Sequence, residues 1–197
     1  PGYSHLTDFI SELAARRSPT ESLMRDAGFI ATGVLYIAFA AGLTWRFRTD
    51  RLAWVASLVL ALGGAARIGA GIFACEPGCA ENAISLSQDW HYRYAAAGYW
   101  LMMWAAVMWG LVGNRYSPLR RLLAIGIGVA IWSAVSLALM DFYPEWQGLL
   151  QRFASGILSV WVLVLAVMVW RVGESPMTLA PSSAPAEPDA SSRLSRR

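Results

Sequence analysis

Three titratable side chains near the start of the chain have a spacing that suits catalysis or ligand binding. His5, Asp8 and Glu12 are three and four residues apart, so in a helix they would share one face. A carboxylate beside an imidazole holds it in one tautomer and raises its basicity, which favours both acid–base chemistry and metal binding. The alternative is that residues 1–18 form an amphipathic segment on the membrane surface, with these side chains toward water.

His91 is the only other histidine, and it follows Asp89 and Trp90 at the entry to an apolar segment. It is either an interfacial anchor or a partner of His5 around a metal or a substrate. The catalytic candidates are therefore His5, Asp8, Glu12 and His91. These residues do not identify a particular cofactor.

Arg67 interrupts the apolar segment Leu52–Cys75, about 12 Å before its end if the segment is helical. An ionisable group at that depth needs a partner or water. It could form an ion pair with Asp141, Glu76 or Asp8, or it could bind an anionic head group or a carboxylate.

Four more polar residues are candidates for ligand binding alongside Arg67. They are Ser4, Glu76, Gln151 and Arg152. Gln151 and Arg152 lie on or near one face of the last apolar segment, where interfacial hydrogen bonding and snorkelling are the alternative.

Cys75 and Cys79 flank the turn-forming sequence Glu-Pro-Gly. An oxidising compartment would favour a disulfide between them. A metal site shared with a histidine and a pair of free thiols are the alternatives, although two cysteines at this spacing are a weak zinc signal because structural zinc needs four ligands.

The composition identifies a membrane protein. Hydrophobic residues make up 56% of the 197 residues, charged residues 15%, and the mean hydropathy is +0.43. Five apolar segments are long enough to span a bilayer as helices. They are Ala27–Trp45, Leu52–Cys75, Tyr94–Asn114, Leu122–Met140 and Phe153–Trp170. The predicted fold is therefore an all-α polytopic transmembrane helix bundle with five spans, over residues 1–172.

Small residues and helix-start signals add detail to these spans. Gly63, Gly64 and Gly69 belong to a cluster that would let a neighbouring helix approach closely. The sequence Ser-Pro-Thr-Glu at 18–21 predicts a helix start near Pro19 with Ser18 as its cap. Tyr-Pro-Glu at 143–145 predicts another start, before the last span.

The arginines set the expected orientation, since cytoplasmic loops carry the excess of basic residues. Ten of the sixteen arginines, against four acidic residues, fall on one set of connections with the C-terminal tail. The other connections carry five arginines and nine acidic residues. We therefore expect a plasma membrane protein with residues 1–26 extracytoplasmic and a disordered cytoplasmic tail at 173–197. The net charge of +3 reflects this topology and does not indicate a nucleic-acid partner.

Three segments resemble a prokaryotic membrane family catalogued as domain of unknown function nine-nine-eight. They are Pro-Gly-Tyr-Ser-His-Leu-Thr-Asp-Phe-Ile-Ser-Glu-Leu at 1–13, Gly-Ile-Phe-Ala-Cys-Glu-Pro-Gly-Cys at 71–79, and Gly-Leu-Leu-Gln-Arg at 148–152. The family usually has glycine where this chain has Ala14. The resemblance implies a sixth helix before residue 1 in the intact protein, and it implies no known activity.

Two functions compete on this evidence. The first is a membrane enzyme or ligand-binding protein with a polar extracytoplasmic pocket, acting on a lipid or lipid-linked substrate. The second is a non-catalytic accessory subunit of a larger membrane complex, or a binder of lipid or small molecules. The sequence has no phosphate-binding glycine loop, no His-Glu-x-x-His and no Gly-x-Ser-x-Gly. A small transporter ranks below both, because no inverted repeat is evident.

Overall fold

A computed structural model of the chain describes residues 2–79 and 85–172. Those ranges contain helices and no β-strand. The α-helices are α1 (Glu21–Leu23), α2 (Thr32–Arg46), α3 (Arg51–Ile72), α4 (Leu86–Asn114), α5 (Arg121–Met140) and α6 (Gln147–Val172). A π-helical stretch at Met24–Ala31 joins α1 to α2, and short 3₁₀ helices lie at Ile10–Ala14, Ser117–Leu119 and Pro144–Trp146.

Five helical stretches within the described ranges are long and apolar enough to cross a membrane, which confirms the predicted all-α bundle. They are Glu21–Arg46, Arg51–Ile72, Leu86–Asn114, Ser117–Met140 and Pro144–Val172. Each overlaps one predicted span. The second ends at Ile72, three residues before the predicted Cys75, because the chain leaves the helix to enter the cysteine turn.

The helix starts follow local capping chemistry. The Asp50 carboxylate accepts hydrogen bonds from the backbone N–H groups of Leu52 (2.8 Å) and Ala53 (3.3 Å), which satisfies donors at the start of α3. The predicted start at Pro144 is confirmed. The Ser18 hydroxyl accepts from the Thr20 backbone N–H at 3.4 Å, but the N-cap is Thr20, so the predicted cap position at Ser18 is wrong.

In place of the Ser18 cap, the first helix begins at Glu21. The Glu21 carboxylate accepts from the Arg17 backbone N–H at 2.7 Å. Arg17 has a positive φ of 67°, and this turn shifts the helix start two residues along the chain.

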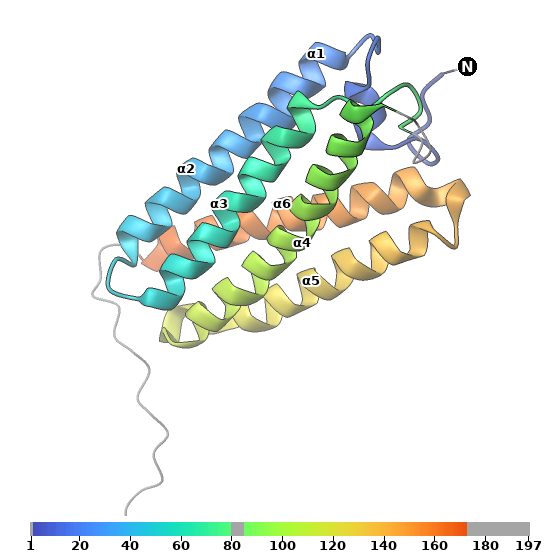
Figure 1. Cartoon of the computed structure of the whole chain (residues 1–197). Helices are drawn as coiled ribbons and strands as arrows, with labels where there is room; N and C mark the ends of the chain where they lie inside the picture. Colours follow the sequence, from blue (N-terminus) through green and yellow to red (C-terminus); the bar gives the residue numbers. More distant parts are fainter. Residues whose placement is uncertain (1, 80–84, 173–197) are drawn as a thin grey trace, which may run out of the picture.

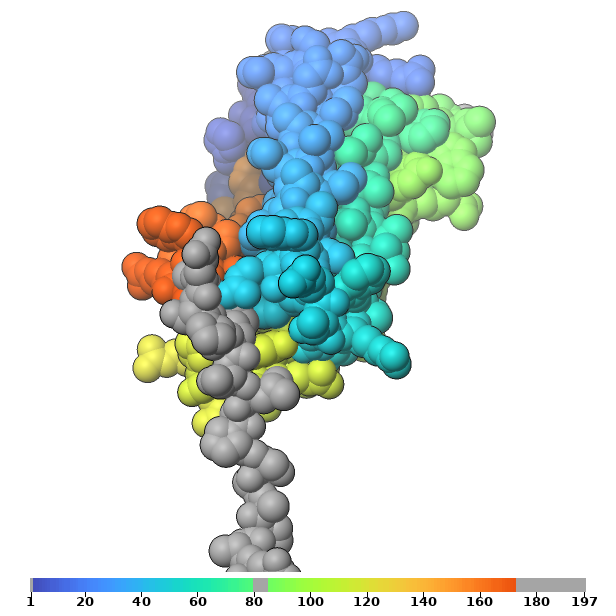
Figure 2. All heavy atoms as spheres, turned by 90° about the vertical axis from the view of Figure 1, so that its left-hand side faces the viewer, coloured from blue at the N-terminus to red at the C-terminus, as the bar shows by residue number. Residues whose placement is uncertain are grey.

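The helices run up and down, so their connections gather at two ends. We call one the arginine-rich end; it carries the α2–α3 and α4–α5 connections and the end of α6. The other, the acidic end, carries the N-terminal segment (residues 2–18), residues 73–79, Ser85 and residues 141–146. Figure 1 shows this alternation, and Figure 2 looks onto the arginine-rich end. The predicted disordered tail at 173–197 lies outside the described residues.

Glycines allow close contacts between helices, as predicted for the second span. A Cβ added at Gly64 would lie 2.7 Å from the Gly33 carbonyl oxygen of α2, and one at Gly69 would lie 2.6 Å from the Tyr94 ring of α4. Between α4 and α5, a Cβ at Gly126 would collide with the Ala106 carbonyl. These contacts fix where the helices are tightly joined.

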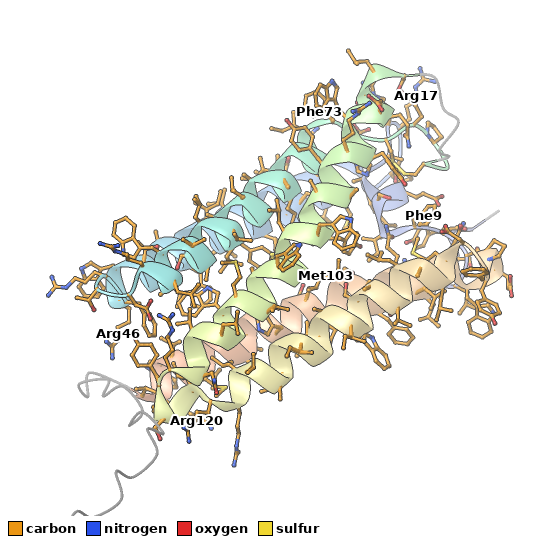
Figure 3. The ribbon with its side chains drawn as sticks, turned by 60° about the horizontal axis from the view of Figure 1, so that its bottom comes forward. Phe9, Arg17, Arg46, Phe73, Met103 and Arg120 are labelled. Atoms are coloured by element: carbon orange, nitrogen blue, oxygen red, sulfur yellow. A yellow bond between two sulfur atoms is a disulfide. The ribbon has the colours of Figure 1, made fainter. Side chains whose placement is uncertain are left out.

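The bundle is closed at the arginine-rich end and divergent at the acidic end. Figure 1 shows α5 and α6 separating from α2, α3 and α4 toward the acidic end, and Figure 3 shows the same divergence with Phe9 at the wide end. The N-terminal segment occupies the gap between the helix ends. This arrangement positions the cavity described next.

Candidate functional site

A cavity of about 330 Å³ lies in the divergent half of the bundle. Its wall includes residues from α2, α3, α4, α5, α6 and the N-terminal segment. Aromatic and apolar side chains make up most of the wall, and a few polar groups face it. This combination is typical of a site for a small molecule with a polar group and an apolar body.

Arg67 is the permanent cation in the cavity wall. It lies five residues before the end of α3, which is about 7.5 Å along a helix. Its Nε donates to the Gly28 carbonyl at 3.2 Å, and its guanidinium lies 5.6 Å from the centre of the Phe29 ring. No carboxylate among residues 2–79 and 85–172 lies within 4 Å of it. The ion pairs predicted with Asp8, Glu76 or Asp141 therefore do not form among the described residues.

His91 is held in one orientation at the same cavity. Its Nδ1 lies 2.8 Å from the Ala70 carbonyl and 2.9 Å from the Phe73 carbonyl, at the end of α3 where helix carbonyls lack partners within the helix. Both partners are acceptors, so Nδ1 carries the proton. When the ring is neutral, this leaves a lone pair on Nε2. The side chain is only 4% exposed and lines the cavity.

Hydroxyl and amide groups complete the polar part of the wall. Tyr99 of α4 and Ser155 of α6 both line the cavity, together with Arg67. The hydroxyls of Tyr36 in α2 and Ser159 in α6 are 3.2 Å apart and join the two diverging groups of helices. These groups could orient a ligand that Arg67 attracts.

The N-terminal segment is fastened to the start of α6 by Arg152 and Gln151. One Arg152 guanidinium nitrogen donates to the carbonyls of His5 (2.9 Å), Asp8 (3.0 Å) and Gly148 (2.7 Å). The other donates to the Tyr3 hydroxyl. The Ile10 N–H donates to the Gln151 side-chain oxygen at 2.6 Å. Arg152 thus positions the segment that closes the wide end of the cavity.

Within this segment the predicted acid–base group has other partners. The Asp8 carboxylate accepts from the Ser4 N–H (2.8 Å) and the Thr7 hydroxyl (2.7 Å), and these bonds lower the pKa of that carboxyl. Glu12 accepts from the Phe9 N–H at 2.9 Å. The His5 ring is exposed and packs edge-on against the Tyr3 ring.

The prediction that His5, Asp8 and Glu12 share one helical face is wrong. Residues 5–8 form turns, and the helix that follows is a short 3₁₀ helix, Ile10–Ala14. The chain leaves helical geometry because its backbone groups bond to side chains of α6 and to its own carboxylates. None of the three side chains lines the cavity.

Cys75 and Cys79 are joined by a disulfide bond beside the N-terminal segment. Gly78 and Cys79 have positive φ values of 82° and 44°, which make the tight turn that brings the sulfurs together. The Cys75 carbonyl accepts from the Arg16 N–H at 2.9 Å. Glu76 forms an ion pair with Arg16 at 3.7 Å, outside the cavity lining.

Residues 1–168 match the model of a protein family described as "Protein of unknown function (DUF998)". The chain belongs to the DUF998 family. No curated protein and no solved structure matches it significantly.

The three segments that resemble DUF998 meet at the acidic end of the bundle. The Leu149 N–H of the third donates to the Leu6 carbonyl of the first at 3.1 Å. In the second, the Cys75 Sγ lies 3.5 Å from the Ser11 carbonyl oxygen of the first. A Cβ added at Gly148 would collide with the backbone at Asp8. The three segments together build the cap over the cavity.

The structure therefore brings together three of the candidates and separates the rest. Arg67, His91 and Gln151 line the cavity of this DUF998 protein, whereas His5, Asp8, Glu12, Ser4, Glu76 and Arg152 do not. In the part of the chain that the structure describes, no group of three or more His, Cys, Asp or Glu side chains could hold a metal ion. The sequence interpretation missed Gln88 and Tyr99, which flank His91 on broadly the same face of α4.

Proposed function

We propose that this DUF998 protein binds an anionic amphipathic ligand, a lipid or lipid-linked molecule, in the cavity beside Arg67. The observation that supports this most directly is Arg67, which lines the cavity and whose guanidinium has no carboxylate within 4 Å among the residues described. A cation within a membrane span is expensive unless it is paired or hydrated. An anionic ligand would supply the missing partner.

The rest of the cavity suits the two parts of such a ligand. The guanidinium can bind a phosphate or a carboxylate through two parallel hydrogen bonds. The Nε2 of His91 can accept a hydroxyl proton from the polar head. The aromatic wall, including Tyr36 and Trp100, offers apolar surface for an acyl or isoprenoid chain.

The excess of arginine at the opposite end supports an extracytoplasmic position for the cavity in the plasma membrane. The ligand would then come from the outer leaflet. The C-terminus would be cytoplasmic and residues 1–26 extracytoplasmic.

The test is binding of two probes to the full chain in phosphatidylcholine nanodiscs, one a fluorescent phosphatidic acid and the other a fluorescent fatty acid. Arg67→Gln should lower the affinity for whichever probe the wild type binds more tightly. The decrease should be at least tenfold, about 1.4 kcal/mol, since a hydrogen-bonded charge is lost. Arg93→Gln is the matched control, because Arg93 lies at the same end but is exposed and paired with Asp89 at 2.9 Å. Equal affinity of Arg67→Gln and the wild type for both probes would refute the proposal.

A catalytic function is the second candidate, and the orientation of His91 favours it. A neutral imidazole with a free Nε2 beside a bound ester or phosphoester could act as a general base for hydrolysis or transfer. The same nanodiscs report on this role if the lipid is analysed after incubation. If the lipid is chemically unchanged after incubation, the catalytic role is excluded and binding remains as the proposed function.

A further inference from the structure

The cavity reaches the flank of the bundle between α4 and α5. Two stripes of lining residues form this rim. On α4 they are Tyr92, Ala96 and Trp100, spaced by four residues. On α5 they are Leu137 and Met140, and Asp141 follows directly after that helix. Tyr92 is 55% exposed and Trp100 is 61% exposed, so the rim is uncovered although its residues line the cavity.

The rim is open because α4 and α5 touch closely only in their other half. A Cβ at Gly110 would lie 2.8 Å from the Leu123 Cα, and one at Gly113 would lie 2.7 Å from the Leu119 carbonyl oxygen. These contacts all lie near the arginine-rich end. From there the two helices separate toward the rim (Figure 1, Figure 3).

The other boundaries of the cavity are joined by contacts. Across the boundary between α2 and α6, the Tyr36 and Ser159 hydroxyls are 3.2 Å apart. Gly63 and Gly69 of α3 are packed against Met102 and Tyr94 of α4. The Ser133 hydroxyl of α5 donates to the Ala154 carbonyl of α6 at 3.3 Å. The N-terminal segment covers the acidic end. The flank between α4 and α5 therefore leads from the cavity to the surface that spanning helices present to lipid.

We infer that this flank is a lateral portal, through which a membrane lipid places its head at Arg67 while its acyl chain lies between α4 and α5. The inference rests on the proposed function and adds the route and the position of the chain. Charge favours this occupant, because Arg67 attracts an anion inside while the rim is apolar except at Asp141. Trp100 and Tyr92 at the rim are side chains that favour the membrane interface.

The portal is tested by photo-crosslinking with the full chain in nanodiscs that contain a phosphatidic acid with an alkyne on its acyl chain. A benzophenone amino acid replaces Trp100 at the rim, or Trp104 as the matched control. Trp104 is on the same helix and is 59% exposed, but it does not line the cavity. Each position is tested with Arg67 and with Arg67→Gln.

We expect the acyl chain to crosslink at position 100. With Arg67→Gln the crosslinking yield at this position should fall about tenfold, which is the change that a loss of 1.4 kcal/mol of binding free energy predicts. Crosslinking at position 104 should not depend on Arg67, because bulk lipid supplies it. Yields that respond equally to Arg67→Gln at both positions would overturn the portal. So would a crosslink from position 100 to protein, since a protein segment would then cover the rim.

A second pair of variants tests whether lipid enters through the portal, without a crosslinking amino acid in the protein. Ala96→Trp fills the rim, and Ala97→Trp places the same bulk one residue away, on an exposed position outside the cavity lining. Ala96→Trp alone should slow uptake of long-chain phosphatidic acid about tenfold. Equal uptake by both variants, with binding still lost in Arg67→Gln, would refute the portal and keep the proposed function. Unchanged binding in Arg67→Gln would instead refute the proposed function.

Discussion

The two halves of the bundle are built from the same five helices but packed in different ways. In the arginine-rich half, glycines bring backbones together, as at Gly110 and Gly126, around a core that contains the fully buried side chains of Trp109 and Trp161. In the acidic half the helices diverge and enclose about 330 Å³ beside Arg67. In the first half all five helices pack directly. In the second, α3 still packs against α4 at Gly69, whereas the N-terminal segment bridges the gap to α6.

This difference separates the residues that hold the fold from those that can bind. A tightly packed half provides a rigid base from which the other half can diverge without the bundle falling apart. The divergent half depends on polar anchors such as Arg152, and these anchors also cap the cavity. Substitutions in the arginine-rich half should therefore lower the stability of the whole bundle, whereas substitutions in the acidic half should loosen only the region around them.

The largest effect is expected from Gly126→Ala in the tightly packed half. The added Cβ would collide with the Ala106 carbonyl, and backbone cannot move aside as a flexible side chain can. We expect a loss of about 3 kcal/mol in the free energy of unfolding, measured by denaturation in detergent. Gly128→Ala is the matched control, because a Cβ there meets nothing within 4 Å. Equal stability of the two variants would contradict this account of the packing.

Much of this tightly packed half could be predicted from the sequence. Charge-free windows identify the spans because lipid cannot satisfy a free backbone, and the arginines identify one end. The small residues of the second span were correctly predicted to allow close approach, although Gly64 and Gly69 lie in the part of α3 nearer the acidic end. The partner of each glycine could not be predicted, because the pairing of Gly126 with Ala106 depends on how two helices lie in space.

A smaller, local effect is expected from Arg152→Gln in the divergent half. The change removes the guanidinium that holds the carbonyls of His5 and Asp8 and the hydroxyl of Tyr3. Opening of residues 2–18 should become easier by about 2 kcal/mol, since hydrogen bonds to a charged group are lost. Amide hydrogen exchange would show faster exchange there and unchanged exchange in α5.

Arg171→Gln is the control for that experiment, because it removes an exposed arginine at the other end of the molecule. If Arg152→Gln loosened α5 as much as residues 2–18, the two halves would not be separable units. If neither region changed, Arg152 would not be the anchor of the cap.

The candidate site was harder to predict than the fold, because it too depends on contacts between segments that are far apart in the sequence. His5, Asp8 and Glu12 have helical spacing, but contacts with α6 hold the backbone of residues 5–8 in turns. Spacing in the sequence predicts only local geometry. The cap is held by contacts between distant residues, such as Ile10 with Gln151 and Ser11 with Cys75. Arg67 was identified because a charge within a span needs a partner wherever the neighbouring helices lie.

The smallest effect is expected from protonation of Asp8 within the cap. Hydrogen bonds from the Ser4 N–H and the Thr7 hydroxyl lower the pKa of this carboxyl below the ordinary value of 3.8. The carboxylate therefore stabilises the cap fully above the unfolded pKa, and this stabilisation is lost as pH falls through the lower folded pKa. Cleavage of residues 2–18 by pepsin is followed from about pH 5 to about pH 2, and each rate is divided by that of Asp8→Asn so that the pH dependence of pepsin itself cancels. This ratio should rise as pH falls across that window.

Asp8→Asn isolates this contribution, because it keeps one acceptor oxygen and removes the titration while Glu12 stays in both proteins. The variant should be cleaved faster than the wild type at the upper end of the range, and the two rates should converge at the lower end. A constant difference across the range would mean that Asp8 acts through packing alone. A difference that grows as pH falls would have the wrong sign for a carboxyl with a lowered pKa, and the cap would then depend on its contacts with α6 alone.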